Sequence, residues 1–389
     1  MFKQKKKIIL FFSRGTSLSI WVKSGLFDRE IEPYKKYTRT LYEVSFLTYG
    51  KNDDAKFVNQ LNPIEILYNR FKLPVDVFSL LCPFIYRKQL KQSDLYKTHQ
   101  INGWWAAGLA KLLYRKPLLV RCGYLLSTNQ EQPWKNYSSI RIKLVSLLEK
   151  LAFLYADAII VTTPQMKSDA IKRHKLPTEK ITVIPNTVDI NVFKPIPEIE
   201  KIKGRIGFVG KFTPQKNIHL LIEAVSGMKD TSVILIGNGP LKSEIECKAK
   251  SIGLNVTFLG NVPNYSLPEL LNTCEAFVLP SEWEGMPKSL IEAMACGIPV
   301  IGTDVAGIRD IIKHGKNGYL CKPEVVEIRN AINSVMGNKQ LRQTLGNNAR
   351  KFIVENYSLE GNLHKEIKLS NDLVKYAYRN KRRSPIGYN

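Results

Sequence analysis

The sequence predicts an α/β protein built from two doubly wound domains. Short apolar runs of strand length alternate with longer amphipathic segments of helix length, the pattern of parallel sheets covered by crossover helices. At 389 residues the chain exceeds what one hydrophobic core usually accommodates. Residues 189–204, rich in proline and charge, separate two such alternating series and are predicted to form a linker.

The apolar runs of the first domain, residues 1–188, predict strands at residues 7–12, 42–48, 75–80, 95–98, 118–121, 158–161 and 181–184. Those of the second domain, residues 205–360, predict strands at residues 205–209, 232–236, 256–259, 276–279 and 299–301, with helices beginning near Lys216, Pro240, Ser266 and Lys288. A last helix, from about Ser358 to Lys381, is expected to pack back toward the first domain. A basic tail completes the segment 361–389.

The composition is that of an ordinary globular protein, with 44% hydrophobic and 24% charged residues. Six scattered cysteines without a CxxC pair predict buried thiols in a reducing cytoplasm and no metal site. No secretory signal is expected, because the apolar run after the basic start, residues 8–12, has only strand length. No transmembrane segment is expected either, since prolines interrupt the longest apolar stretch, residues 73–86.

The net charge of +24 is concentrated in residues 1–190, which carry 31 Lys and Arg against 15 Asp and Glu. Such an excess can face nucleic acid, an anionic membrane surface or phosphorylated ligands. Because the lysines are dispersed and no RNP, KH or helix-turn-helix pattern is present, nucleic acid is not the expected partner. The first domain is predicted to dock on an anionic membrane surface at the inner face of the plasma membrane, with Trp21, Tyr34 and Tyr37 as exposed aromatic residues.

The densest motif is the stretch PSEWEGMPKSLIEAMACGIPVI at residues 280–301. A predicted strand ends before it, and a loop with Gly285 and Pro287 leads into a helix. Free backbone N–H groups and polar side chains therefore gather at the carboxyl edge of a sheet, where open α/β sheets bind ligands. The helix N-terminus suits a phosphate. Glu284 and Glu292 place two carboxylates near different parts of such a ligand.

Two Glu separated by seven residues and followed by AMACGIPVI resemble the signature of the family 4 retaining glycosyltransferases. Further elements follow in family order: residues 210–217 resemble its G-R-x-x-x-x-K element, residues 237–241 its G-x-G-P-L turn, and residues 258–262 its base-binding strand end. The resemblance implies the GT-B fold, in which two Rossmann-like domains face each other across a cleft. It also implies transfer from a UDP- or GDP-sugar, without cofactor or metal, to a glycan or lipid-linked acceptor in surface polysaccharide or glycolipid biosynthesis.

The resemblance further implies roles for single residues. Lys211 and Lys216 would neutralise the diphosphate as its glycosidic bond breaks. Glu284 would hold hydroxyls of the donor sugar, and Glu292 would accept hydrogen bonds from the ribose. The leaving phosphate would itself assist the incoming hydroxyl. The rest of the donor site would comprise Gly15, Gly210, Gly237, Asn261, Val262, Gly285, Met286, Pro287, Ser289 and Leu290.

The chain departs from the family pattern at three places. Lys211 stands where the family usually has Arg, which keeps the charge and loses the bidentate fork. After the first strand one glycine, Gly15, replaces the common pair, and a plain helix cap at Thr16 or Ser17 is an equally good interpretation. Arg121, Cys122 and Gly123 stand where members often carry His-Gly, so the donor sugar stays open.

The acceptor is assigned to the first domain through Arg14, His99, Trp104 and Arg121, and for His99 a structural role is equally open. Two other functions remain as alternatives. A GT-B-like sugar-nucleotide epimerase would need acid and base residues that the sequence does not place. A basic nucleic-acid-binding protein would account for the charge but not for the motifs.

Overall fold

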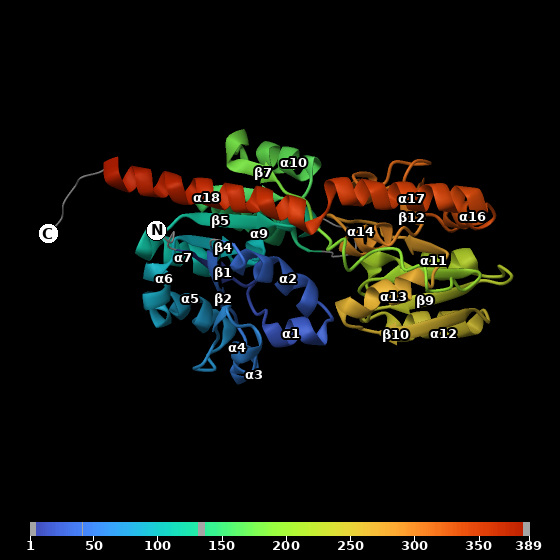
Figure 1. The fold of residues 1–389 in the computed structure, drawn as a ribbon, viewed down its shortest axis with the longest axis horizontal. Helices are drawn as coiled ribbons and strands as arrows, with labels where there is room; N and C mark the ends of the chain where they lie inside the picture. The colour runs from blue at the N-terminus through green and yellow to red at the C-terminus, as the bar shows by residue number, and fades with distance from the viewer. Residues whose placement is uncertain (1–4, 41, 131–136, 384–389) are drawn as a thin grey trace. The chain divides into compact units, whose positions relative to one another are not determined.

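The computed structural model describes residues 5–40, 42–130 and 137–383, so the predicted basic tail from residue 384 on lies outside the described residues. The chain forms two compact units, each with its own parallel sheet (Figure 1). Unit 1 comprises Met1–Ile184 and Leu363–Asn389, and unit 2 comprises Pro185–Asn362. The segment 189–204, predicted to be a linker, thus belongs to unit 2.

The sheet of unit 1 has the order β3-β2-β1-β4-β5-β6-β7, and all its pairings are parallel. The strands are β1 (Lys6–Phe11), β2 (Tyr42–Leu47), β3 (Glu65–Leu67), β4 (Leu95–Thr98), β5 (Leu118–Cys122), β6 (Ala158–Val161) and β7 (Ile181–Val183). The chain first builds outward from β1 to β3 and then returns to place β4 on the other side of β1. The loops after β1 and β4 therefore flank a topological switch point.

Helices cover both faces of this sheet. Crossovers between parallel strands are right-handed, so the helices of the three connections β3–β4, β4–β5 and β5–β6 lie on one face of the sheet. These helices are α5 (Val75–Ile85), α6 (Arg87–Gln92), α7 (Trp104–Tyr114), α8 (Leu126–Gln130) and α9 (Ser139–Tyr155). The other helices of unit 1 are α1 (Leu18–Lys23), α2 (Phe27–Thr38), α3 (Asn52–Ala55), α4 (Phe57–Gln60) and α10 (Pro164–His174). The C-terminal helix α18 (Leu359–Arg383) packs in unit 1 through most of its length, where Glu366 contacts Tyr37 of α2.

The predicted strand at residues 75–80 is wrong, because this segment begins the helix α5. Its residues are apolar at almost every position, so neither a strand period nor a helix period stands out. In the structure Phe78 and Cys82, four residues apart, face the core, whereas Leu80 and Phe84 are exposed. The six other strands predicted for this half are confirmed to within two residues, and the three-residue β3 escaped prediction.

The sheet of unit 2 has the order β10-β9-β8-β11-β12-β13, again entirely parallel. Its strands are β8 (Arg205–Val209), β9 (Ser232–Ile236), β10 (Asn255–Gly260), β11 (Ala276–Leu279), β12 (Val300–Thr303) and β13 (Tyr319–Cys321). Its helices are α11 (Ile218–Val225), α12 (Lys242–Ser251), α13 (Leu267–Asn272), α14 (Lys288–Ala295), α15 (Ala306–Arg309), α16 (Val325–Met336) and α17 (Lys339–Asn356). The five predicted strands are confirmed, and β13 was not predicted. The switch point lies between β8 and β11.

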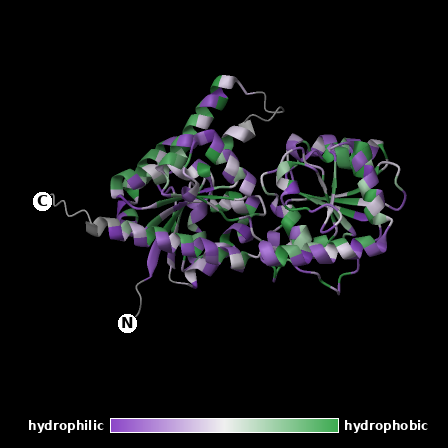
Figure 2. Cartoon of the chain, turned by 90° about the horizontal axis from the view of Figure 1, so that it is seen from above, coloured by the Kyte–Doolittle hydropathy of each residue, from purple (hydrophilic) through white to green (hydrophobic). Residues whose placement is uncertain are grey.

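Each unit buries its own hydrophobic core, formed by the strands and the inner faces of the helices. Figure 2 shows the strands of both sheets as mostly hydrophobic and the surrounding helices as mixed, as expected when both faces of a parallel sheet are covered. Five of the six cysteines are buried, but Cys247 is exposed, which corrects the prediction of six buried thiols. Burial raises the pKa of Cys296 to about 12.

Candidate functional site

The polar motif of unit 2 lies at the switch point of its sheet. β8 leads into residues 210–217 and its neighbour β11 leads into residues 280–287, so both loops leave the same carboxyl edge. The two loops are joined directly, because Glu282 N–H donates to the Gln215 carbonyl at 3.0 Å and the Gln215 side chain donates to the Trp283 carbonyl at 2.9 Å. Crevices of this kind are where open α/β sheets bind ligands.

Lys216 and Glu284, one from each loop, form an ion pair with Nζ and Oε1 2.5 Å apart. Ser281 Oγ donates to the same carboxylate oxygen at 2.7 Å. The side chains of Lys216 and Glu284 are 16% and 5% exposed, so the pair is largely shielded from water. Lys211, by contrast, is exposed. The site thus holds one ammonium group oriented by a carboxylate and a second one that faces solvent.

The glycine turn after β9 lets the backbone strands of this edge approach closely. Gly237 has a φ of 136°, and a Cβ there would lie 1.9 Å from the carbonyl oxygen of Gly210. Its N–H donates to the Gly260 carbonyl at 2.7 Å, and Gly210 N–H donates to the Ile236 carbonyl at 2.9 Å. The loops after β8, β9 and β10 therefore form one continuous backbone layer beside the Lys216–Glu284 pair.

Glu292 lies within α14 and is almost fully buried. One of its carboxylate oxygens accepts from Asn264 Nδ2 at 3.2 Å, and Asn264 directly follows the loop that contains Asn261 and Val262. Asn261 is exposed and Val262 is half-buried. The structure therefore brings the predicted ribose-binding carboxylate and the predicted base-binding loop together through Asn264, a residue that the sequence did not single out.

The N-terminus of α14 combines backbone donors with a fixed approach of the chain. No side-chain hydrogen bond caps this helix at Pro287, and its first turn points the positive end of the helix dipole at the loop. Pro287 has no N–H to offer, and the side chain of Leu290 is buried in the core, so Ser289 and the backbone provide the polar groups. Asn186 holds the preceding turn, because its Nδ2 donates to the Met286 carbonyl at 2.9 Å. The sequence analysis did not single out Asn186.

The switch point of unit 1 carries Arg14 and Gly15 after β1 and His99 after β4. Arg14 Nε donates to Asp76 Oδ1 at 2.7 Å. Gly15 has a left-handed φ of 76°, which glycine adopts without strain. Ser17 caps α1 by accepting from the Ile20 N–H, so the capping interpretation is confirmed for Ser17.

The remaining predicted acceptor residues already have partners within unit 1. His99 Nε2 lies 3.1 Å from Glu30 Oε2, and its ring lies 5.0 Å from the ring of Trp21. Trp104 is half-buried and stacks on Trp105 with ring centroids 6.3 Å apart. Arg121 Nη1 lies 3.4 Å from Glu366 Oε2. These side chains are packed within unit 1, and among the described residues Nδ1 of His99 is buried without a hydrogen-bond partner.

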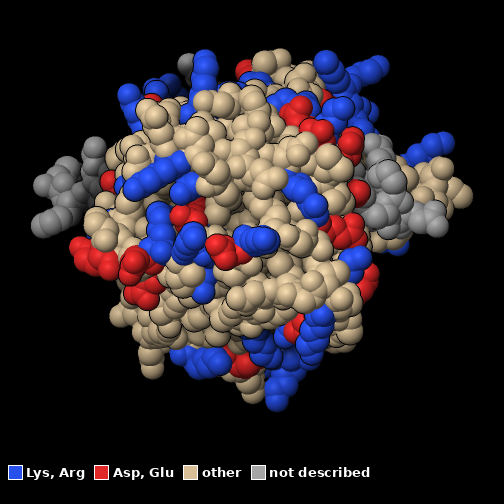
Figure 3. Space-filling model, turned by 90° about the vertical axis from the view of Figure 1, so that its right-hand side faces the viewer, with Lys and Arg blue, Asp and Glu red and all other residues tan. Residues whose placement is uncertain are grey.

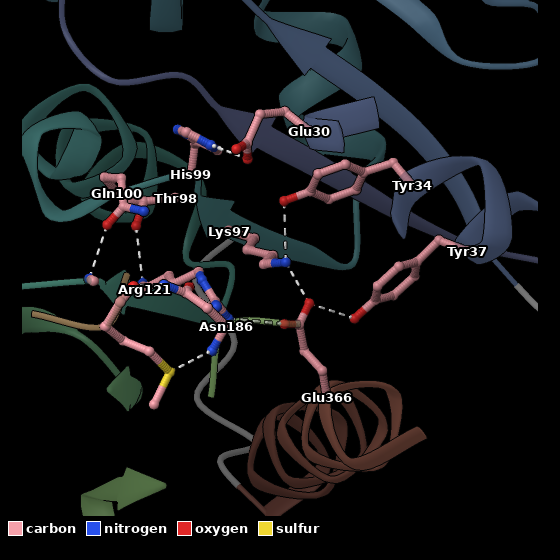
Figure 4. A network of polar contacts seen from close by, with 12 residues as sticks. Glu30, Tyr34, Tyr37, Lys97, Thr98, His99, Gln100, Arg121, Asn186 and Glu366 are labelled. Carbon is pink, nitrogen blue, oxygen red and sulfur yellow. Dashed lines mark hydrogen bonds and ion pairs between the residues drawn. The ribbon is translucent and has the colours of Figure 1, made fainter. Parts of the chain in front are cut away.

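Arg121 belongs to a buried polar network at the centre of unit 1 (Figure 4). Lys97 pairs with Glu366 and donates to Tyr34 at 3.1 Å, and Tyr37 donates to Glu366 at 2.9 Å. Burial alone would raise the pKa of Glu366, but the charges of Lys97 and Arg121 and the hydrogen bonds from Lys97 and Tyr37 hold it below its ordinary value of 4.5. Since Glu366 lies on α18, the network fixes the C-terminal helix to the sheet.

Charged side chains are dispersed on the face that Figure 3 draws. Figure 3 shows one face of the molecule, on which Lys and Arg lie in several separate groups with Asp and Glu between them. The described residues on this face form no continuous basic stripe of the kind that a nucleic-acid backbone requires. Within the described parts of the chain, no three His, Cys, Asp or Glu side chains are grouped as metal ligands would be.

Two parallel doubly wound sheets, one with a lysine–carboxylate pair at its switch point, define the GT-B class of α/β proteins. Comparison with family models agrees. The model of the glycosyl transferases group 1 matches residues 189–352, and that of glycosyltransferase family 4 matches residues 35–192. The chain therefore belongs to the family 4, group 1 glycosyltransferases, as its motifs predicted.

Individual relatives are similar over both units. The uncharacterized glycosyltransferase MJ1607 of Methanocaldococcus jannaschii is 28% identical over 264 residues, which cover 63% of this chain and 64% of that protein, slightly less than two thirds of it. The UDP-Gal:alpha-D-GlcNAc-diphosphoundecaprenol alpha-1,3-galactosyltransferase of Escherichia coli is 27% identical over 260 residues, covering 61% of this chain and 67% of that one. Among solved structures, Anabaena Alr3699/HepE in complex with UDP and glucose matches with a TM-score of 0.75 at 21% identity, covering 95% of this chain and all of that one.

Proposed function

We propose that this protein transfers a sugar, with retention of its anomeric configuration, from a nucleoside diphosphate sugar to a glycan or lipid-linked acceptor. The observation that carries the proposal is the Lys216–Glu284 pair at the switch point of unit 2. A diphosphate sugar combines an anionic group with several hydroxyls. An oriented ammonium group next to a carboxylate, both shielded from water, matches that combination.

Cleavage of the glycosidic bond requires stabilisation of the negative charge on the leaving diphosphate. Lys216, held by Glu284, and the exposed Lys211 would neutralise the phosphate oxygens as negative charge accumulates there. The backbone donors at the start of α14 would add partial positive charge. Lys216 and the backbone donors of α14 would already be oriented before the reaction, so little reorganisation of these groups would be needed when the glycosidic bond breaks.

Glu284 and Glu292 would bind the neutral parts of the donor. Glu284 accepts hydrogen bonds from Ser281 and Lys216 at Oε1, so Oε2 would be directed to hydroxyls of the sugar. Glu292, beside Asn264, would accept from the ribose, and residues near Asn261 would contact the base. The E. coli relative is named for a UDP-sugar donor and the Anabaena structure contains UDP, which favours UDP over GDP for this chain.

The acceptor would be a hydroxyl of a glycan or of a lipid-linked sugar, as in the synthesis of surface polysaccharides or glycolipids. The name of the E. coli relative, which specifies a diphosphoundecaprenol-linked acceptor, supports the lipid-linked form. Retention requires the acceptor hydroxyl to approach on the face that the diphosphate leaves. An oxygen of the departing phosphate would then take up the hydroxyl proton.

A screen of UDP-, GDP- and ADP-sugars tests the proposal. We expect one nucleotide to raise the melting temperature of the protein, and Lys216→Ala and Glu292→Ala to abolish that rise. Donor hydrolysis, followed by NMR of the anomeric proton, should yield a sugar of unchanged anomeric configuration. Release of an epimerised sugar nucleotide would assign the chain to an epimerase instead. A protein that is stabilised by none of the donors would contradict the proposal.

A further inference from the structure

The helices on one face of the unit 1 sheet expose apolar side chains outward. On α9, Ile140, Leu144, Leu147, Leu151 and Leu154 are all exposed, with Ile140 81% accessible. At 3.6 residues per turn these five positions fall within an arc of about 80° on the helix surface. The opposite side of α9 buries Ala152 and Phe153 in the core. The helix is therefore apolar on both sides, although folding in water needs only one.

The two neighbouring helices of the same layer continue this pattern. α5 packs against α7, and α7 packs against α9. Leu80 and Phe84 of α5 and Trp105 and Leu112 of α7 are exposed, at 63%, 53%, 43% and 65%. We call the exposed apolar side chains of α5, α7 and α9 the apolar face. Soluble monomers rarely expose a contiguous apolar area across three helices without a partner.

Positive charges border the apolar face. On α9, Lys143 and Lys150 flank the leucine stripe on one side and Arg141 lies on the other, and all three are exposed. Helices α5, α6, α7 and α9 carry seven Lys and Arg but only two acidic residues. One of these two, Glu149, is fully buried and bound to His174 and Ser127. The charge presented around the apolar face is thus almost entirely positive.

We propose that the apolar face docks unit 1 onto the surface of an anionic lipid bilayer, with the leucines in the acyl boundary and the flanking Lys and Arg at the lipid phosphates. Apolar area flanked by basic residues is the combination that interfacial helices use. No helix within the described residues is long and apolar enough to cross a bilayer. A second copy of the chain fits less well, because two such faces would bring their basic borders together.

This surface replaces the one predicted from sequence. The predicted aromatic contacts are wrong, because Trp21, Tyr34 and Tyr37 are buried in the core of unit 1. Trp105, on the apolar face, is an exposed residue of the aromatic type enriched at membrane interfaces. The inference goes beyond sugar transfer and uses none of the donor-site residues, so either can hold without the other.

Vesicle flotation with the full-length protein tests the proposal. We compare phosphatidylcholine vesicles with vesicles that also contain phosphatidylglycerol, using the native chain and two variants. The triple change Leu144→Ser, Leu147→Ser, Leu151→Ser removes the centre of the stripe, and Lys143→Gln with Lys150→Gln removes one basic border. Val326→Ser with Tyr265→Ser, two exposed apolar residues of unit 2, is the matched control.

We expect the native chain and the control to float with the anionic vesicles. The leucine variant should bind them at least tenfold more weakly, and the lysine variant should lose the preference for anionic over neutral vesicles. Equal flotation of the native chain and the leucine variant would overturn the proposal. So would a native dimer that the leucine changes dissociate, without any vesicle binding. Because all changed side chains are exposed, unaltered circular dichroism and UDP-dependent stabilisation will show that the variants are folded and that donor binding is separate.

Discussion

Replacing Lys216 by Met separates the structural from the chemical contribution of the ion pair in unit 2. Removing one member of a buried pair typically costs about 3 to 5 kcal/mol of stability. Here Glu284 keeps its hydrogen bond from Ser281 and Lys216 is 16% exposed, so we expect a loss of about 2 kcal/mol. For a unit of this size that lowers the melting temperature by about 6 °C. Under the proposed role of Lys216 at the diphosphate, its loss should reduce kcat by a further factor of about 100 to 1000.

The double variant Lys216→Met, Glu284→Gln distinguishes the two effects. Without a buried unpaired carboxylate it should regain most of the lost stability while sugar transfer stays low. Thermal unfolding and the steady-state rate of donor hydrolysis measure the two quantities. Lys203→Met, at an 84% exposed lysine of the same unit, is the control and should change neither. Recovery of transfer in the double variant, in parallel with stability, would refute a direct role of Lys216 at the diphosphate.

Three further predictions concern packing and titration. Gly237→Ala should destabilise unit 2 by about 3 kcal/mol in urea unfolding. The new Cβ would lie 1.9 Å from the Gly210 carbonyl oxygen, at a φ that only glycine adopts readily. A loss of stability below about 1 kcal/mol would mean that the two loops separate easily. Glu366→Gln should destabilise the protein most at neutral pH, because the lowered pKa of Glu366 makes its contribution complete above 4.5 and lost as the pH falls through the folded-state value. The native and variant unfolding free energies should therefore converge in acid, and a constant difference would contradict the assignment. A thiol titration of the native protein at pH 8 should detect only Cys247, since the other five thiols are buried and burial raises the pKa of Cys296 to about 12; rapid reaction of a second thiol would show that a core opens.

Local sequence patterns correctly predicted most of the strands that consist of one short, buried apolar run. The strands at residues 158–161, 205–209, 232–236 and 276–279 and the start of α14 at Lys288 agree with the structure residue for residue. Each of these strands is a mostly apolar segment, as expected when both faces of a parallel sheet are covered. The strand predicted at residues 75–80, which begin α5, was wrong for the opposite reason. Because its outer face is also apolar, its composition carries no period by which a helix differs from a strand.

The residues of the candidate site also fall into two groups: those that the sequence identifies and those that only the fold brings to the site. The motif around Glu284 and Glu292 and the two lysines after β8 are visible in the sequence, because residue type and spacing suffice to recognise them. Asn186 and Asn264 are not visible, although each bonds to a residue of that motif, and Ser281 lies inside the motif without a role that its position in the sequence indicates. A single Asn or Ser carries no pattern, and its role exists only once folding brings it to its partner.

By itself, the sequence predicted the family, the two parallel sheets and the charged residues of the candidate donor site. Only the tertiary structure decided that Lys216 pairs with Glu284, that Trp21, Tyr34 and Tyr37 are buried, and that the exposed leucines of α9 join those of α5 and α7 in one surface. The physical reason is the distance along the chain over which each kind of signal acts. Periodicity and turn chemistry act within about ten residues of chain, whereas partner choice and exposure depend on contacts between segments that are far apart in sequence.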